Sequence, residues 1–286
     1  MSLLLKALLH RPDKRLLTQF KPPVLPPITH QQCCTLDATQ YQQFCQLTDW
    51  DNMDIVHPCF LQAVSLPMHM ACLSHKRSPF PLLGLIHRSN RIQQFGPLDI
   101  QAPFHFSVGF EGITAHKLGW DIHMYTRVMQ AEVPCYEASS TYLVRARAPH
   151  TGGKIPRKEH GKTFQDESLS EKYVFKAALS APSNMGRRYA KVSKDANPIH
   201  LYAATARLFG FPQAIAHGMW TLSYCVSQFE VADRVKHISV QCDFKKPLLL
   251  PGNAKLLAYE ENGETHFSLI NDEGGSAHIN GSLAQG

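Results

Sequence analysis

The sequence predicts an α+β protein in which two antiparallel sheets each wrap around a central helix, giving a pseudo-dimer within one chain. Three observations favour this class. The chain has 286 residues, enough for two domains of roughly 100–150 residues each. Each half contains an apolar helix pattern followed by segments of alternating apolar residues, which is typical of a buried helix and amphipathic strands. A segment rich in proline, glycine and charge separates the halves.

The N-terminal half, residues 1–150, contains the first copy of this plan. Its apolar helix is expected from about Cys59 to Leu73. Apolar side chains then recur at every second position in 104–110, 122–128 and 142–146. Because successive side chains of a strand point to opposite faces, this alternation predicts strands with one buried face.

The C-terminal half, residues 173–286, repeats the order after an expected linker at 151–172. An apolar helix should begin near His217-Gly218 and run through Val226. The strands expected after it lie at 237–244, 254–260, 265–270 and 276–283. Two such copies could pair their sheets edge to edge.

Composition narrows the functional classes. The formal net charge of +6 comes from scattered Lys and Arg, so nucleic-acid binding is weakly supported. Apolar runs are far shorter than the roughly 18–20 residues that span a bilayer, and no small-residue cleavage site follows the N-terminal apolar stretch. The eight cysteines show no CxxC, which suits reduced thiols and a cytoplasmic location. The sixteen histidines show no HxxxH or HExxH spacing, so no metal site is expected.

A possible acid–base pair lies at 195–200. Asn197 suits a helix N-cap and Pro198 the first helical position, which predicts a helix over 198–209 with His200 in its first turn. Asp195 lies in the preceding loop, so both side chains can approach one small volume. A helix N-terminus favours neutral imidazole, the form that accepts a proton. The alternative is that Asp195 only caps and His200 only packs.

His217-Gly218 could supply a carbonyl-binding amide. Free backbone N–H groups at a helix start can stabilise a developing oxyanion, and glycine allows close approach of a substrate. The alternative is a glycine required only for tight packing of the helix. The occurrence of this element downstream of Asp195 and His200 favours chemistry.

These residues carry a family resemblance. The run YAKVSKDANPIH, followed by FPQAIAHGM, resembles the hydratase 2 motif of MaoC-like proteins. That family contains (R)-specific enoyl-CoA hydratases and 3-hydroxyacyl thioester dehydratases of hot-dog fold. FKKPLLLPGNAKL resembles the strand and turn after the central helix, so the match covers about 185–286. HPCFLQAVSLPMHM and FPLLGLIHRSNRI resemble more loosely the non-catalytic copy of double hot-dog members.

The resemblance implies roles for individual residues. Asp195 and His200 would be the catalytic pair, and the backbone N–H of Gly218 would polarise the thioester carbonyl. Asn197 would hold the loop around this catalytic pair in place, and His217 would be a supporting residue of the site. The N-terminal half would shape an acyl pocket.

This sequence departs from the family pattern at two places. Lys194 stands where glycine or an acidic residue is common. Val226, with Ser223 and Ser227 nearby, stands where some bacterial members place a serine.

The function implied is that of a hydro-lyase in fatty acid metabolism, which reversibly hydrates trans-2-enoyl thioesters to (3R)-hydroxyacyl thioesters. No cofactor is expected, because coenzyme A or phosphopantetheine arrives with the substrate. Expected partners are an acyl-CoA or acyl-carrier-protein thioester, with no nucleic acid and no membrane, and the chain could form a homodimer. The alternatives are a catalytically silent acyl-thioester-binding or assembly subunit, and a hot-dog thioesterase. The sequence leaves open the carrier, the acyl chain length, the physiological direction and the oligomeric state.

Overall fold

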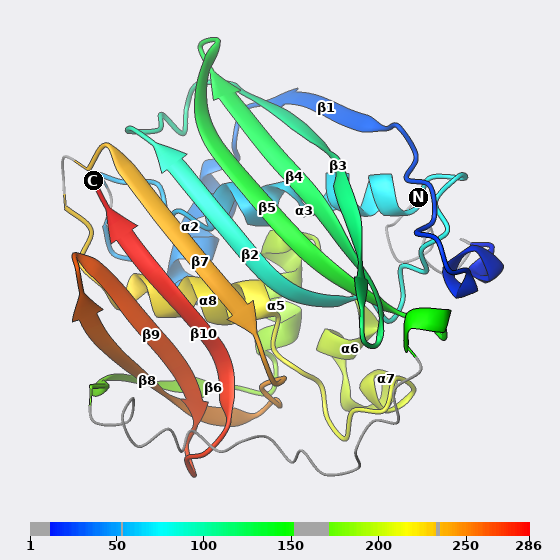
Figure 1. Ribbon diagram of the computed structural model, residues 1–286. Helices are drawn as coiled ribbons and strands as arrows, with labels where there is room; N and C mark the ends of the chain where they lie inside the picture. Colours follow the sequence, from blue (N-terminus) through cyan, green and yellow to red (C-terminus); the bar gives the residue numbers. More distant parts are fainter. Residues whose placement is uncertain (1–11, 53, 152–171, 233–234) are drawn as a thin grey trace.

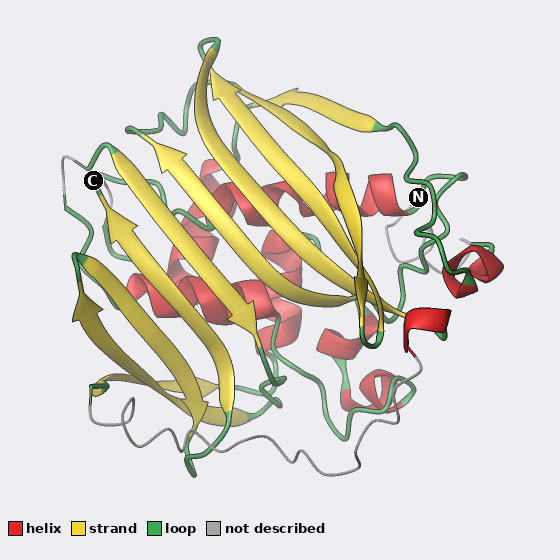
Figure 2. Cartoon of the chain, viewed as in Figure 1, coloured by secondary structure: helices red, strands yellow, loops and turns green. Residues whose placement is uncertain are grey.

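In a computed structural model the structure describes residues 12–52, 54–151, 172–232 and 235–286. Within these ranges the chain forms a ten-stranded antiparallel sheet, and the main helices lie against one face of it (Figures 1 and 2). The expected linker at 151–172 lies almost entirely outside the described residues.

The sheet is built from two sets of strands. The N-terminal set comprises β1 (Thr29–Cys34), β2 (Ile86–Phe95), β3 (Phe104–His116), β4 (Gly119–Gln130) and β5 (Val133–Arg145). The C-terminal set comprises β6 (Val174–Ala181), β7 (His237–Phe244), β8 (Gly252–Glu261), β9 (Glu264–Asn271) and β10 (Ala277–Gln285). All strands predicted from alternation are present, and β7 has the predicted bounds.

The strand order reveals an internal repeat. Across the sheet it is β1-β3-β4-β5-β2-β7-β10-β9-β8-β6. Read inward from either edge, each half places its first, third, fourth, fifth and second strand in succession. The halves meet where β2 pairs with β7 along a register from Ser89–Asp243 to Phe95–His237. The expectation that two sheets pair edge to edge is therefore confirmed.

Each half places one apolar helix between its first and second strands. These central helices are α3 (Phe60–Leu73) and α8 (Gly218–Ser227), and the alternating strand faces pack against them because both must remove apolar surface from water. The other helical elements are η1 (Lys14–Thr18), α2 (Ala38–Thr48), η2 (Pro149–Thr151), α5 (Met185–Ser193), α6 (Pro198–Leu201) and α7 (Ala203–Arg207).

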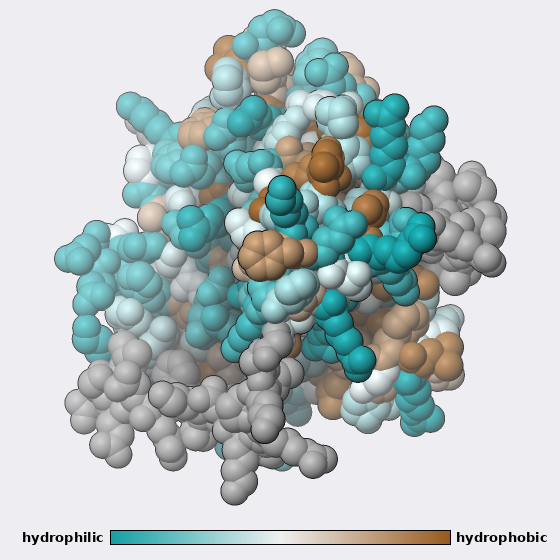
Figure 3. Space-filling view, turned by 45° about the vertical axis from the view of Figure 1, so that its right-hand side comes forward, coloured by the Kyte–Doolittle hydropathy of each residue, from teal (hydrophilic) through white to brown (hydrophobic). Residues whose placement is uncertain are grey.

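One hydrophobic core runs through both halves. Trp220 of α8 is buried and donates its indole N–H to the carbonyl of Leu47 in α2 at 2.7 Å, so the central helix of one half is tied to a helix of the other. The face in Figure 3 carries mainly hydrophilic side chains with small hydrophobic groups between them. In the described part of the chain, no helix is both long and apolar enough to cross a membrane.

Candidate active site

Asp195 lies in the short connection between α5 and α6. The backbone turns there because Lys194 adopts a left-handed conformation with φ of 61°. Asp195 Oδ1 accepts a hydrogen bond from the Asn197 N–H at 3.1 Å, and its side chain is 28% exposed. Asn197 Oδ1 in turn accepts from the Ile199 N–H as the N-cap of α6. The loop is thus organised by side chains that hydrogen-bond to nearby backbone, as short polar residues do at helix starts.

The predicted continuous helix over 198–209 is wrong. Tyr202 is extended, with φ of −145° and ψ of 148°, and it separates α6 from α7. The carbonyl of Leu201, which would continue the helix, instead accepts a hydrogen bond from Arg187 Nη1 of α5 at 2.8 Å. A Cβ on Gly186 would lie 1.8 Å from the carbonyl oxygen of His200. The close packing of α5 on α6 therefore fixes His200, and only glycine permits it.

His200 has a defined hydrogen-bonding state. Its Nδ1 lies 2.8 Å from the carbonyl of Ile215, and since a carbonyl only accepts, Nδ1 must carry the proton. Nε2 makes no hydrogen bond within the described residues and is left as an acceptor. Burial lowers the pKa of His200, opposed in part by Asp195 and the Ile215 carbonyl. The imidazole is therefore neutral at pH 7 and able to accept a proton.

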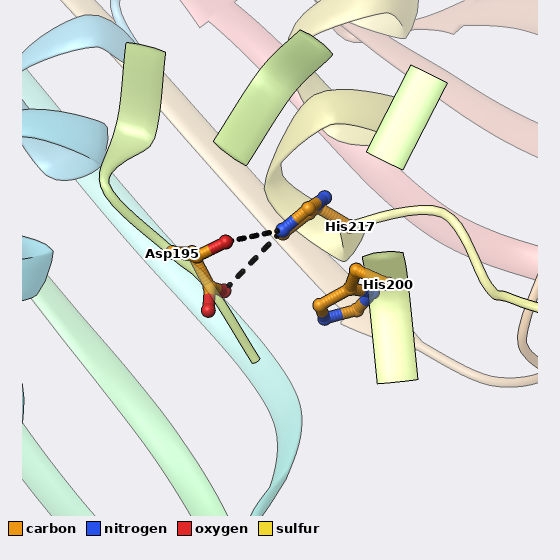
Figure 4. Close-up of side chains that lie close together, drawn as sticks. All are labelled: Asp195, His200 and His217. Carbon is orange, nitrogen blue, oxygen red and sulfur yellow. Dashed lines mark hydrogen bonds and ion pairs between the residues drawn. The ribbon is translucent and has the colours of Figure 1, made fainter. Parts of the chain in front are cut away.

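His217 is the N-cap of α8 and completes a three-residue group with Asp195 and His200 (Figure 4). Its Nε2–H donates to the backbone carbonyl of Asp195 at 3.1 Å and lies 3.7 Å from Asp195 Oδ2. The His217 and His200 rings stack with centroids 3.7 Å apart. Burial and the neighbouring His200 lower the pKa of His217 to about 3. His217 thus holds the Asp195 loop against the start of α8.

Gly218 is the first residue of α8, and its N–H has no partner in the described part of the chain. The loop before it is anchored by the hydrogen bond from Ala216 N–H to the Leu248 carbonyl, so the FKKPLLLPG segment supports the helix start. A Cβ on Gly218 would lie 2.8 Å from Cε1 of Phe244. Both readings of this glycine therefore have physical support: it permits tight packing, and it leaves an amide free at a helix N-terminus.

A pocket of about 890 Å³ brings these residues together with both halves of the chain. Asp195, Asn197, His200, His217 and Gly218 all line it. Apolar side chains from the N-terminal half contribute another wall, namely Ala63, Leu66, Met70, Leu82, Leu85 and Val144. The pocket therefore combines a group of polar residues with an apolar wall, the usual composition of a small-molecule site.

The group also has the residue types of a metal site, since single ligand atoms of Asp195, His200 and His217 lie within 4.8 Å of one another. A metal ligand must offer a lone pair. Nε2 of His217 instead carries the proton that it donates to the Asp195 carbonyl. In this arrangement a hydrogen bond joins His217 to Asp195, His200 stacks on His217, and Nε2 of His217 offers no lone pair to an ion.

Other residues in or near the pocket were not found by sequence reasoning. Gly186 packs under His200 from α5. His87 and Tyr142 line the pocket from the N-terminal half, and the buried Tyr189 ring lies 5.1 Å from that of His217. Tyr189 and His87 fall within segments that carry the family resemblance, but nothing in the sequence singles out any of these positions, because each depends on packing between distant segments. The serines near Val226 bond within α8, with Ser223 Oγ donating to the Met219 carbonyl.

Comparisons with known proteins show what the chain is similar to. A family model described as MaoC like domain matches residues 164–281. Over 219 residues the chain is 30% identical to 3-hydroxyacyl-thioester dehydratase X of Mycobacterium tuberculosis, and the alignment covers 76% of this chain and 74% of that protein.

Solved structures match over nearly the whole chain. The crystal structure of HtdX from Mycobacterium tuberculosis has a TM-score of 0.76 at 24% identity, covering 90% of this chain and 100% of that chain. A second protein of the same organism, described as a double hotdog fold, has a TM-score of 0.56 at 8% identity, covering 92% and 97%. With the repeated strand order and the two central helices, these matches establish a double hot-dog fold.

Proposed function

The chain belongs to the MaoC-like domain family, and we propose that it reversibly hydrates trans-2-enoyl thioesters to (3R)-3-hydroxyacyl thioesters. Its relative in Mycobacterium tuberculosis carries the name of a 3-hydroxyacyl-thioester dehydratase, which supports a hydro-lyase. The proposed residue roles rest on the chemistry of the pocket, and the (3R) configuration is what the resemblance to (R)-specific enoyl-CoA hydratases implies.

A water molecule between Asp195 and His200 would be the nucleophile. The carboxylate oxygen of Asp195 and a ring nitrogen of His200 lie within 4.8 Å, a separation that one bridging water can span with two hydrogen bonds. Since Nδ1 of His200 donates to the Ile215 carbonyl, Nε2 is the atom that can accept the water proton. Asp195 would accept the second hydrogen of the water and orient its oxygen.

The proton balance closes within this pair. As the water oxygen bonds to C3 of the enoyl group, one water proton passes to His200 Nε2, and the C2–C3 π electrons move toward the thioester carbonyl. The resulting enolate is then protonated at C2 by the His200 imidazolium, which regenerates the neutral ring. Dehydration follows the same steps in reverse. General acid–base catalysis of this kind contributes about 10²–10⁴-fold in rate.

The Gly218 N–H would stabilise the negative charge on the thioester oxygen. Its amide is unpartnered in the described residues and lies at the N-terminus of α8, where the helix dipole favours negative charge. A single oxyanion donor of this type accounts for about 10²–10³-fold in rate. Asn197 and His217 would act by holding the Asp195 loop in place.

The substrate would reach the pair through the pocket described above. Its apolar wall from the N-terminal half suits an acyl chain, so we assign residues 1–150 to substrate binding and 173–286 to catalysis. The thioester carrier would be coenzyme A or the phosphopantetheine of a carrier protein, and no further cofactor is required.

The observation that carries the proposal is the convergence of Asp195, His200 and the free Gly218 amide on one pocket. The test follows the absorbance of the enoyl group of crotonyl-CoA, and of longer trans-2-enoyl thioesters on both carriers, with wild-type protein and Asp195→Asn. We expect hydration by the wild type and a loss of at least about 10²-fold in kcat for the variant, with (3R) product by chiral chromatography.

Three results would contradict the proposal. Binding of acyl thioesters without hydration at any chain length would favour the silent subunit. Release of free thiol would favour a thioesterase. Unchanged turnover in Asp195→Asn would remove this carboxylate from the mechanism. Dialysis against EDTA should leave activity unchanged, and a loss reversed by a divalent metal would instead assign the three-residue group to metal binding.

A further inference from the structure

The N-terminal half contributes an aromatic stack to the pocket. The stack lies beside the seam between the two halves, where β2 pairs with β7. His87 of β2 lies opposite Tyr142 of β5 in the strand register, and their rings stack with centroids 4.7 Å apart and planes inclined by 23°. The His87 ring also lies 4.8 Å from that of Phe244, the last residue of β7. All three line the pocket.

Phe244 connects this stack to the proposed oxyanion amide. Its Cε1 and Cδ1 lie 2.8 and 2.9 Å from where a Cβ on Gly218 would be, so the phenyl ring rests directly on the glycine. His87 supports the same ring from the neighbouring strand across the β2–β7 seam. A contiguous set of contacts therefore runs from the N-terminal half to the first residue of α8.

The other side of the stack is held by a chain of buried hydrogen bonds. Tyr142 Oη lies 3.3 Å from His69 Nδ1, His69 Nε2 lies 2.8 Å from Thr126 Oγ1, and Thr126 Oγ1 donates to Ser65 Oγ at 3.3 Å. Ser65 Oγ ends the chain by donating to the carbonyl of Gln62 in α3. Only one arrangement of protons satisfies every link, with each group donating to the next one in the direction of the Gln62 carbonyl. Tyr142 is thereby fixed in place, and His87 packs on a rigid support.

His87 itself is suited to packing rather than to proton transfer. Burial lowers its pKa to about 4, so the ring is neutral at pH 7. Its Nε2 is buried and has no hydrogen-bond partner in the described part of the chain. The side chain thus acts through its ring faces.

We propose that His87 is a positioning residue of the C-terminal site: its imidazole, stacked on Tyr142, supports the Phe244 ring that fixes the Gly218 amide at the start of α8. The N-terminal half then contributes to rate as well as to acyl binding. This inference rests on the proposed function only for its kinetic test.

The test compares His87→Ala with His87→Phe, which keeps an aromatic ring against Tyr142 and Phe244. We expect kcat for a trans-2-enoyl-CoA to fall about 10- to 100-fold in His87→Ala, since small misplacements of a catalytic group cost up to about 10²-fold, with KM within about threefold. His87→Phe should retain kcat within about threefold and leave the shape of the kcat–pH profile unchanged above pH 5.

A matched control exists at the opposite end of the same seam. His237 of β7 stacks on Phe95 of β2, with centroids 5.3 Å apart and planes inclined by 17°, and neither residue lines the pocket. His237→Ala removes the same kind of contact and should leave kcat within about twofold.

A second measurement is independent of activity. Hydrogen–deuterium exchange of peptides covering 215–224 should be faster in His87→Ala than in wild type, His87→Phe and His237→Ala. Wild-type kcat and exchange in His87→Ala would overturn the proposal, and so would an equal loss of kcat in His87→Phe, which would assign the role to a ring nitrogen. If the wild type hydrates no enoyl thioester, the proposed function fails, and the exchange data alone decide whether His87 positions α8.

Discussion

Each central helix has a histidine at or just before its start, and the two histidines lie in very different surroundings. His217-Gly218 opens α8 onto a pocket of about 890 Å³, whereas His57 and Pro58 precede α3 in a packed interior. His57 is fully buried, its ring lies 5.1 Å from that of Phe44 and 4.6 Å from that of Trp50, and its Nε2–H donates to the Ser223 carbonyl of the other central helix.

The difference lies in the segment that precedes each central helix. In the N-terminal half, α2 is one regular helix whose Phe44 fills the space beside His57. In the C-terminal half the corresponding segment is divided into α5, α6 and α7, and the loop between α5 and α6 presents Asp195. The carboxylates between α2 and α3, Asp49, Asp51 and Asp54, are all exposed. Thus the same fold forms a candidate site in the half where the helical segment before the central helix is interrupted by a loop. It forms a packed core in the half where that segment is one continuous helix.

The largest expected effect is on kcat, and it should distinguish His200 of the C-terminal half from His57 of the N-terminal half. His200→Ala removes the proposed base and should lower kcat by about 10²–10⁴-fold. His57→Ala should keep kcat within about threefold, and should lower the free energy of unfolding by about 1–3 kcal/mol because the Ser223 carbonyl and the Cys59 N–H lose their partner. Steady-state hydration kinetics and urea unfolding measure both. A comparable loss of kcat in the two variants would mean that the N-terminal copy also takes part in chemistry.

The next effect concerns the helix start itself. Gly218→Ala places a methyl group against the Phe244 ring, so either the ring or the helix start must move. We expect kcat to fall by about 10²–10³-fold, the range for loss of one oxyanion donor, with little change in thermal unfolding temperature. The double variant Gly218→Ala with Phe244→Leu should recover part of the activity by making room. Wild-type kcat in the single variant would contradict the view that the contact between Gly218 and Phe244 fixes the position of the amide.

A smaller effect is expected at Gly186, which only the folded structure identifies. Alanine there would overlap the His200 carbonyl oxygen, and since that atom is backbone, α6 must shift. We expect a loss of up to about 10²-fold in kcat and of about 1–3 kcal/mol in stability. Gly112→Ala is the matched control, because its nearest neighbour would be His123 Cδ2 at 4.0 Å, and it should change stability by less than about 0.5 kcal/mol.

Local patterns explain why part of the site was predictable. Asp195, Asn197 and His200 lie within one loop and one helical turn, and Gly218 begins a clearly apolar helix, so sequence spacing alone indicates their positions. The roles of these residues remain predictions. Strands with strict alternation, such as β7, were predicted for the same reason.

Other elements carry no such local signal. β2 has the inward residues Asn90, Ile92 and Gln94, and its two buried amides hide the apolar alternation. They are accommodated only because Asn90 donates to Ser140 and Gln94 donates to the Val56 carbonyl. Contacts between segments that are distant in sequence decide such positions, and a single sequence does not reveal them.

The smallest expected effect is a pH dependence. Acid should lower the reaction rate through His200 of the C-terminal half and the stability through His57 of the N-terminal half. Because the pKa of His200 is lowered from its usual value near 6.5, the acid limb of kcat/KM should lie below pH 6.5, and the rate should not change from there to pH 8.

Stability should also decline in acid. Burial lowers the pKa of His57 to about 3, so between about pH 6.5 and 3 the unfolded chain binds a proton that the folded chain does not, and stability falls as the pH falls through this window. His57→Gln removes one such group. It should reduce the slope of unfolding free energy against pH by about 1.4 kcal/mol per pH unit without moving the acid limb of kcat/KM. A shift of that limb in His57→Gln would mean that the buried histidine of the N-terminal half is coupled to the proton transfer at His200, and the two helix starts would then not be functionally separate.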